Sequence, residues 1–252
     1  MLFENKVALV TGGAGGIGRA AALGFAREGA AVMVTDVNDA GSAETVKMIE
    51  EAGGKAAYLN IDVSDEAAVK MMVDKTVTQF GALHYALNNA GVGGDMGVAI
   101  QDLDYERYQR VMDINVGGVW LCMKYEIPAI LESEGGAIVN VASVAGILAI
   151  SRNSAYTASK HAVIGLTKTA ALENARKNLR VNAVCPAFID TAMVREIGDT
   201  MPRIMDNILA TSPMRRLGQP QEVSEAVLWL CSDAASFVTG HSMVIDGALT
   251  HH

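Results

Sequence analysis

The sequence has few charged and few aromatic side chains. Asp, Glu, Lys and Arg make up 19% of its 252 residues, and Phe, Trp and Tyr make up 5%. Globular proteins average about a quarter charged residues, whereas half of this chain is hydrophobic and its mean hydropathy is +0.24. This composition excludes a disordered or fibrous chain, because disordered segments combine low hydrophobicity with high charge. A chain of this length buries roughly 70–75% of its unfolded surface, which supports one large domain or two small ones.

Hydrophobic runs that would predict a membrane-spanning helix are also missing. The uncharged stretch Gly135–Ser151 has 17 residues and includes Asn140, two serines and three glycines. A spanning helix needs about 20 predominantly apolar residues. Residues 1–6 precede the first predicted strand and leave no room for a signal peptide. We therefore expect a cytoplasmic protein without a membrane partner, whose apolar surplus lies in a core, an oligomer interface or a ligand site.

Basic clusters and paired cysteines are the remaining absences. The 20 basic residues are outnumbered by 28 acidic ones, which gives a net charge of −8 and a pI near 5.1. No basic cluster exceeds two residues, so no nucleic-acid partner is predicted. The cysteines, at 122, 185 and 231, lie far apart and form no CxxC pair. Neither a disulfide framework nor a metal site is expected.

What the chain does contain is a regular alternation of strand and helix patterns. The apolar run Val7–Thr11 is typical of a strand buried on both faces, and Ile17–Glu28 has helical periodicity. Further strands are predicted at 31–35, 56–61, 83–87, 137–142, 180–185 and 242–245. Further helices are predicted at 43–51, 65–80 (with Ser64 as its N-cap), 103–131, 156–175 and 222–232. Such alternation indicates a doubly wound Rossmann-type α/β fold, with about seven parallel strands and helices on both faces. A single domain over residues 1–252 is expected.

A glycine-rich turn, Thr11–Gly18, separates the first predicted strand from the first predicted helix. Glycines there let the backbone turn tightly and approach a pyrophosphate, whose charge lies at the N-terminus of the following helix. Two registers fit a dinucleotide motif: GxGxxG at positions 13, 15 and 18, and TGxxxGxG at positions 12, 16 and 18. Either register predicts a dinucleotide site at the start of the chain.

Asp36 follows the second predicted strand, 18 residues beyond Gly18. In a dinucleotide fold a carboxylate at this place accepts hydrogen bonds from the adenosine ribose hydroxyls. It would also repel the 2′-phosphate of NADP, and neither Gly15 nor Val37 supplies a compensating basic side chain. The sequence therefore favours NAD over NADP.

Tyr156 and Lys160 stand four residues apart, so a helix places the phenol and the ammonium on one face. The pKa of a free tyrosine is about 10, and a nearby ammonium favours the phenolate. Lowering this pKa by about three units requires roughly 4 kcal/mol, which one close cation and a positively charged nicotinamide can supply. Ser143 follows the preceding strand, at the carboxyl edge where parallel sheets bind ligands.

These motifs, in this order and spacing, resemble the single-domain branch of the short-chain dehydrogenase/reductase family. The resemblance covers essentially the whole chain. It implies that Tyr156 is the general acid/base and that Ser143 hydrogen-bonds the substrate oxygen. It implies that Lys160 holds the nicotinamide ribose and acidifies the phenol. Asn115, within the long helix, would anchor a water that leads from Lys160 to solvent.

The same resemblance implies further cofactor contacts at the ends of later strands. Asp62 and Val63 would contact the adenine, residues 89–91 would line the adenosine side, and Ile189 with Thr191 would hold the carboxamide and phosphates. The complete expected cofactor set is Gly12, Gly16, Ile17, Gly18, Asp36, Asp62, Val63, Asn89, Ala90, Gly91, Tyr156, Lys160, Pro186, Ile189 and Thr191. The chain departs from the family pattern at Ala187 and Ala248, where glycine is more common.

Substrate clues come from the segment after the predicted cofactor loop. Residues 188–217 would form a mobile lid over the substrate, as the resemblance implies. Apolar side chains recur there at helical spacing, at Met193, Ile197, Met201, Ile204, Met205 and Ile208. A methionine-rich lid is adaptable, and residues 146–150 add apolar wall. We expect NAD-dependent interconversion of a bulky or cyclic hydrophobic secondary alcohol and its ketone.

Two other functions remain open. A 3-oxoacyl-thioester (acyl-carrier-protein) reductase shares every catalytic motif, although it usually prefers NADP. A non-catalytic nucleotide-binding regulatory protein would not need the intact set of Asn115, Ser143, Tyr156 and Lys160. The family resemblance further implies a homotetramer, in which the helices ending near Leu131 and Ala175 pair across subunits.

Overall fold

A single sheet of seven parallel strands runs through the part of the chain that the computed structural model describes, residues 1–200 and 202–251. The strand order is β3-β2-β1-β4-β5-β6-β7. The strands are β1 (Val7–Thr11), β2 (Ala31–Asp36), β3 (Lys55–Asn60), β4 (Tyr85–Asn88), β5 (Gly136–Val141), β6 (Leu179–Pro186) and β7 (Ser242–Ile245). The predicted parallel sheet is confirmed: β1 and β7 have the predicted bounds, and the ends of the other strands differ from the predicted ones by at most two residues.

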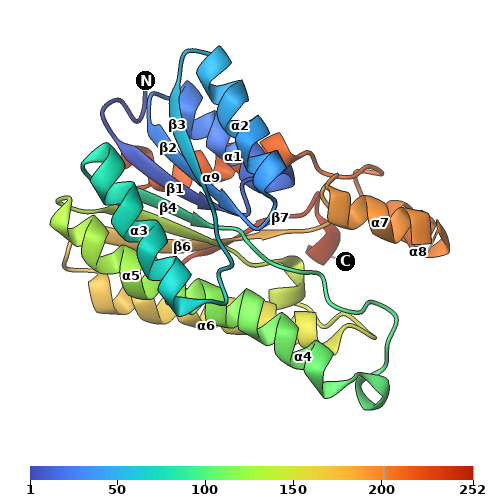
Figure 1. The fold of residues 1–252 in the computed structure, drawn as a ribbon. Helices are drawn as coiled ribbons and strands as arrows, with labels where there is room; N and C mark the ends of the chain where they lie inside the picture. The colour runs from blue at the N-terminus through green and yellow to red at the C-terminus, as the bar shows by residue number, and fades with distance from the viewer. Residues whose placement is uncertain (201, 252) are drawn as a thin grey trace.

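Helices cover both faces of this sheet (Figure 1). On one face lie α1 (Gly16–Arg27), α2 (Asp39–Glu51) and α9 (Pro220–Cys231), which close over an apolar cluster that includes Phe25 and Val227. On the other face lie α3 (Glu66–Phe80), α5 (Gly118–Glu132) and α6 (Ser154–Asn174), whose cluster includes Met72 and Met123. Burial on both faces explains the continuous apolar strands. Much of the apolar surplus of the sequence therefore lies in two cores.

Three further helices stand outside these layers. They are α4 (Tyr105–Met112), α7 (Ala192–Thr200) and α8 (Pro202–Thr211), the last two orange in Figure 1. The segment predicted as a lid thus forms α7 and α8, although Met201 lies outside the described residues. Among residues 1–200 and 202–251, no helix combines the length and the apolarity that crossing a membrane requires.

The expected long helix over residues 103–131 is wrong in detail, because a π-helical turn, Asp113–Gly117, separates α4 from α5. Such a turn holds one more residue than an α-turn and is frequent at functional sites. Just after it, Gly118 lets α5 approach the loop that follows β3. A Cβ at Gly118 would lie 2.7 Å from Cγ2 of Val63.

The N-cap of α3 is also not the expected one. The Asp65 carboxylate accepts hydrogen bonds from the backbone N–H of Ala67 and Ala68, at 2.8 and 3.2 Å. Ser64 instead donates its hydroxyl to Asp62 at 2.7 Å. Aspartate and serine are both preferred N-cap residues, and α3 begins one residue later than predicted.

A buried polar network lies between the sheet and α5. Asn88 donates through Nδ2 to Oε2 of Glu126 and to Oδ1 of Asn140, both at 3.0 Å. Asn140 donates in turn to the hydroxyl of Thr167 at 2.9 Å. Glu126 is fully buried, and its Oε1 has no hydrogen-bond partner, as is also true of Oδ1 of Asn88. Burial raises the pKa of Glu126 to about 7, against the opposing effect of the hydrogen bond from Asn88.

Candidate functional site

A cavity of about 920 Å³ lies at the carboxyl ends of the strands. Ligands bind at this edge in doubly wound sheets, beside the point where the strand order reverses. The order reverses here between β1 and β4. The cavity brings together most of the predicted site residues: Gly12, Gly16, Ile17, Asp36, Asp62, Val63, Asn89, Ala90, Gly91, Ser143, Tyr156, Lys160, Pro186, Ile189 and Thr191. Gly18 and Asn115 do not line it.

The backbone of the glycine turn favours one of the two registers. Gly12 and Gly16 have φ of +65° and +52°, in the left-handed region that favours glycine. Both belong to TGxxxGxG at positions 12, 16 and 18. Gly18, which the two registers share, must stay bare because a Cβ there would lie 2.1 Å from the carbonyl oxygen of Gly12. Of the other register, a Cβ at Gly13 would lie 2.7 Å from Cγ1 of Val34, whereas one at Gly15 would meet nothing within 4 Å.

The start of α1 offers an anion site to this cavity. Gly15 is the N-cap, no side chain caps the helix, and its first turn contains no acidic residue. The orphan N–H groups and the positive end of the helix dipole favour a phosphate at such a place. Thr191 approaches from the other side, because a Cβ at Gly16 would lie 3.1 Å from its Cγ2. This cradle fits the pyrophosphate of a dinucleotide.

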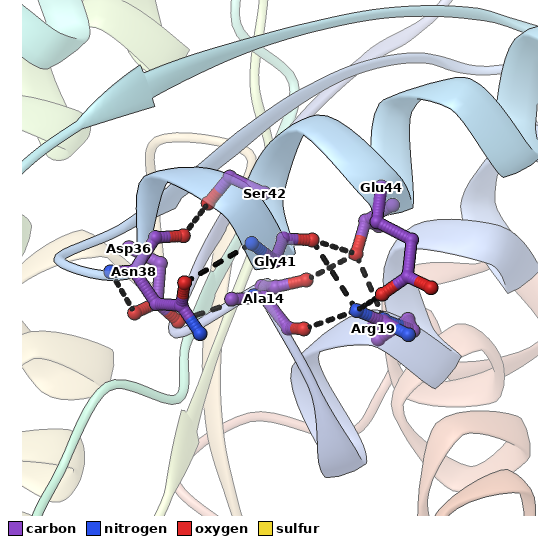
Figure 2. A network of polar contacts seen from close by, with 9 residues as sticks. Ala14, Arg19, Asp36, Asn38, Gly41, Ser42 and Glu44 are labelled. Atoms are coloured by element: carbon purple, nitrogen blue, oxygen red, sulfur yellow. Dashed lines mark hydrogen bonds and ion pairs between the residues drawn. The ribbon is translucent and has the colours of Figure 1, made fainter.

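Asp36 is held at the end of β2 by backbone donors (Figure 2). Its Oδ2 accepts from the N–H of Ala14 at 3.1 Å, and its Oδ1 accepts from the N–H of Asn38 at 2.9 Å. Sequence reasoning missed one basic side chain at this corner, Arg19. Its guanidinium donates to the carbonyl of Ala14 and to the carboxylate of Glu44, both at 2.6 Å. The charge of Arg19 is therefore already paired.

Ser143, Tyr156 and Lys160 all line the cavity. The Lys160 ammonium is buried, donates to the carbonyl oxygen of Val141 at 2.9 Å, and lies 5.5 Å from the centroid of the Tyr156 ring. The Ser143 hydroxyl accepts from the N–H of Ala145 at 3.1 Å. The i, i+4 spacing on α6 thus places phenol and ammonium side by side, as predicted.

The pKa of Tyr156 in the chain alone is opposite in direction to the expected one. Burial raises the pKa of the phenol, and a hydrogen bond with Ser143 only partly opposes this. Burial also lowers the pKa of Lys160 to about 8, so the ammonium is retained at neutral pH. Lys160 alone therefore does not make the phenol acidic. The lowering of the Tyr156 pKa that the sequence predicted, which included the charge of a nicotinamide, stays a prediction for the cofactor-bound protein.

Asn115 lies on the π-helical turn and is fully buried. Its Oδ1 accepts from the N–H of Val92 at 2.9 Å, and its Nδ2 donates to the carbonyl of Val92 and to the hydroxyl of Ser159. Gly91 separates it from Lys160, since a Cβ there would lie 3.1 Å from Oδ1 of Asn115 and 3.7 Å from Nζ of Lys160. Asn115 thus fixes the loop after β4 against α6.

A second cavity, of about 350 Å³, adjoins the first at Ser143 and Tyr156. Its wall is largely apolar and includes Val144, Ala145, Ile150, Phe188 and Met193. Its charged lining residues are Asp95 and Glu196. Asp95 is paired with Arg107 at 2.8 Å. No lysine or arginine among the described residues lines this cavity.

The predicted apolar wall and lid contribute less to this cavity than expected. Of residues 146–150, Ile150 lines it, whereas Ile147 and Leu148 are exposed. Of the apolar lid residues named from the sequence, Met193 lines it, whereas Ile208 is buried at a different cavity; Phe188 and Val194 of the same segment also line it. Met201 and the side chains of Ile197 and Ile204 lie outside the part of the chain that the structure describes. Across residues 1–200 and 202–251, no group of three or more His, Cys, Asp or Glu could hold a metal ion.

Known proteins resemble this chain over almost its whole length. A model of the family described as enoyl-(acyl carrier protein) reductase matches residues 12–250. The cyclohexanol dehydrogenase of an Acinetobacter species is 45% identical over 98% of this chain and 96% of that protein. The 2,5-dichloro-2,5-cyclohexadiene-1,4-diol dehydrogenase of Sphingobium indicum is 41% identical over 98% of each chain. A solved short-chain type dehydrogenase/reductase from Mycobacterium ulcerans has a TM-score of 0.94 at 31% identity, covering 100% of this chain and 92% of that one. The chain belongs to the short-chain dehydrogenase/reductase family.

A second solved member of the family was crystallised with cofactor. The structure of NAD⁺-bound xylitol dehydrogenase has a TM-score of 0.94 at 35% identity, covering 98% of this chain and 100% of that one. As a short-chain dehydrogenase/reductase, the present chain is an oxidoreductase that acts on CH–OH groups.

Sequence reasoning missed one lining residue of this short-chain dehydrogenase/reductase, Asn153. It is the N-cap residue of α6, and it lines the second cavity together with Tyr156. Its role depends on the cavity, which spacing along the sequence does not predict.

Proposed function

We propose that this enzyme oxidises a secondary alcohol on an uncharged ring to its ketone, reversibly, with NAD. The observation that carries the proposal is the position of Ser143 and Tyr156. These two side chains lie where the larger cavity, which the glycine turn and Asp36 line, meets the smaller one with its largely apolar wall. A dinucleotide in the first cavity and a ring in the second would meet at the phenol.

The residues that would hold the cofactor are those of the first cavity. The start of α1 would bind the pyrophosphate, Asp36 the adenosine ribose, and Asp62 with Val63 the adenine. Residues 89–91 would line the adenosine side, and Ile189 with Thr191 would hold the carboxamide and phosphates. When bound, NAD supplies the acceptor for the substrate hydride. The Asp36 carboxylate favours NAD over NADP, and Arg19 at this corner is already paired with Glu44.

Proton transfer would depend on Tyr156. Its phenolate would take the hydroxyl proton of the alcohol, while the Ser143 hydroxyl hydrogen-bonds the same oxygen. Lys160 would hold the nicotinamide ribose and stabilise the phenolate. Asn115 would anchor a water that passes the proton from Lys160 to solvent. Its own amide is committed to Val92 and Ser159, which fixes its position.

The substrate class follows from the second cavity. Apolar side chains dominate its wall, and its charged residues are carboxylates, which repel an anionic substrate. This disfavours acids and phosphate-bearing acyl thioesters, and it favours neutral rings. The names of the two curated relatives, a cyclohexanol and a cyclohexadiene-diol dehydrogenase, agree with that class. Residues 188–217 would act as the lid that closes over the ring, with Met193 as its contact.

The proposal extends to the assembly and the location of the protein. Leu172 on α6 is 82% exposed and Trp120 on α5 is 49% exposed, which supports pairing of these helices across subunits of a homotetramer. A cytoplasmic location fits the composition.

The test is a panel of alcohols with both cofactors. We expect kcat/KM for cyclohexanol and larger cyclic alcohols to exceed that for polyols, and NADH to bind more tightly than NADPH. Preference for a polyol would refute the substrate class, and tight NADPH with weak NADH binding would refute the role of Asp36. Reduction of a 3-oxoacyl thioester with NADPH as the best reaction would identify the chain as a thioester reductase instead.

A further inference from the structure

Asn153 is a buried amide without a partner at the wall of the second cavity. It precedes α6, where its carbonyl oxygen accepts from the N–H of Thr157 at 3.0 Å, and the residue is 4% exposed. A side chain at this position normally accepts from the first-turn N–H groups of its helix. Here it makes no such bond. The amide lines the cavity instead.

The other buried asparagines show how unusual this is. Each of them donates through Nδ2 to a protein acceptor: Asn88, Asn115, Asn140, Asn174 and Asn182. Among the buried asparagines of the described residues, Asn153 is the exception. Buried polar groups are hydrogen-bonded in the great majority of cases, and the exceptions call for an explanation, such as a bound group that satisfies them. An unpartnered amide in a cavity wall points to a ligand.

The amide also has a fixed place relative to the reacting phenol. Asn153 is the N-cap residue of α6, and Tyr156 lies in the first turn of that helix. Gly94 confines the amide from the opposite wall, because a Cβ there would lie 3.3 Å from Oδ1 of Asn153 and 3.6 Å from Cβ of Tyr156. Asn153 and Tyr156 therefore flank the same part of the second cavity.

We propose that Asn153 binds a second oxygen substituent on the substrate ring and thereby orients the reacting carbinol toward Tyr156. The amide offers one acceptor and two donor hydrogens, so it suits either a hydroxyl or a ketone. This inference rests on the proposed function and narrows it to rings that carry two oxygens. The cyclohexadiene-1,4-diol in the name of one relative is a ring of this kind. Asn153 is on this view a positioning residue for the substrate.

The other polar residues of the cavity are less suited to this task. Asp95 is already paired with Arg107. Glu196 and Thr200 are exposed residues of α7, and the Thr200 hydroxyl donates to the carbonyl of Glu196 at 2.7 Å. Asn153 combines burial and a free amide with attachment to the helix that carries the catalytic tyrosine.

The test compares kcat/KM for cyclohexane-1,4-diol with that for cyclohexanol. The wild type should prefer the diol. In Asn153→Leu, which removes both hydrogen-bonding functions at similar volume, the ratio should fall about tenfold, equivalent to about 1.4 kcal/mol. Ile150→Leu alters the same wall without changing a polar group, and it should change kcat/KM for both substrates by a similar factor. An unchanged diol-to-cyclohexanol ratio in Asn153→Leu overturns the inference.

A second variant separates recognition from a structural role. The carboxylate of Asn153→Asp accepts but does not donate hydrogen bonds. The Asn153→Asp variant should therefore keep the wild-type kcat/KM for the diol, whose hydroxyl can donate to the carboxylate. Its kcat/KM for 4-hydroxycyclohexanone should fall about tenfold, because the ketone oxygen only accepts hydrogen bonds. Equal losses with both substrates would show that Asn153 only supports the fold. If the wild type oxidises cyclic alcohols but neither variant shifts these ratios, this inference alone fails. If the wild type oxidises no cyclic alcohol, the proposed function fails with it.

Discussion

Replacing Glu126 by glutamine removes the carboxyl group from the network between α5 and the sheet while nearly keeping its shape. The folded chain raises the pKa of this buried group from 4.5 to about 7. Between these two values the folded state keeps a proton that the unfolded state has lost, so stability falls as pH rises. The interval, at 1.36 kcal/mol per pH unit, corresponds to about 3 kcal/mol. Above about pH 7 the carboxyl is ionised in both states, and its contribution stops changing.

Urea unfolding of both proteins, at one protein concentration and at about pH 5 and about pH 8, measures this effect. We expect Glu126→Gln to gain about 2–3 kcal/mol in free energy of unfolding, relative to the wild type, between the lower and the higher pH. Glu132→Gln changes an exposed residue of the same helix and should show no such gain. If the wild type and Glu126→Gln depend equally on pH, the carboxyl is solvated and the reasoning from its burial is wrong.

Three further changes test the site and the assembly. Tyr156→Phe should lower kcat by about 10²–10⁴-fold, the range for a general acid–base, while NADH titration still shows binding; a tenth of the wild-type rate would contradict the mechanism. Asp36→Ala should weaken NAD binding about 10–100-fold through the lost hydrogen bonds to a charged group. NADP binding should not weaken, whereas collapse of the turn would weaken both cofactors. Leu172→Glu should yield a smaller particle by light scattering, because a charge would enter the proposed interface; an unchanged mass would exclude this face.

Most of the sheet could be predicted from sequence because its strands are buried on both faces. Continuous apolar runs such as Val7–Thr11 predict the positions of such strands directly. The break between α4 and α5 could not be predicted, because residues 103–131 keep a helical pattern. A π-helical turn differs from an α-helical turn only in that its hydrogen bonds span one more residue. The N-cap of α3 was missed by one residue because Ser64 and Asp65 are both good caps.

The candidate site was predictable where the chemistry depends on spacing along one element. The glycine turn and the pair on α6 are of this kind. Arg19 and Asn153 were missed because their roles depend on contacts between elements, with Glu44 and with the second cavity. Glu126 was overlooked although it continues an i, i+4 row from Cys122 to Ile130, both buried. A charged residue at an apolar position of a helix face is expected to be buried, but a search for apolar periodicity does not select it.

The π-helical turn acts as a rotational offset between α4 and α5. One residue corresponds to about 100° of an α-helix with 3.6 residues per turn. Deleting one residue from Asp113–Gly117 would therefore change the distance between α4 and α5 very little, but it would rotate α5 about its axis. The row with Glu126 would leave the sheet, and Asn115 would lose Val92. Among related sequences, the positions of this segment other than Asn115 should tolerate substitution far better than a change in length.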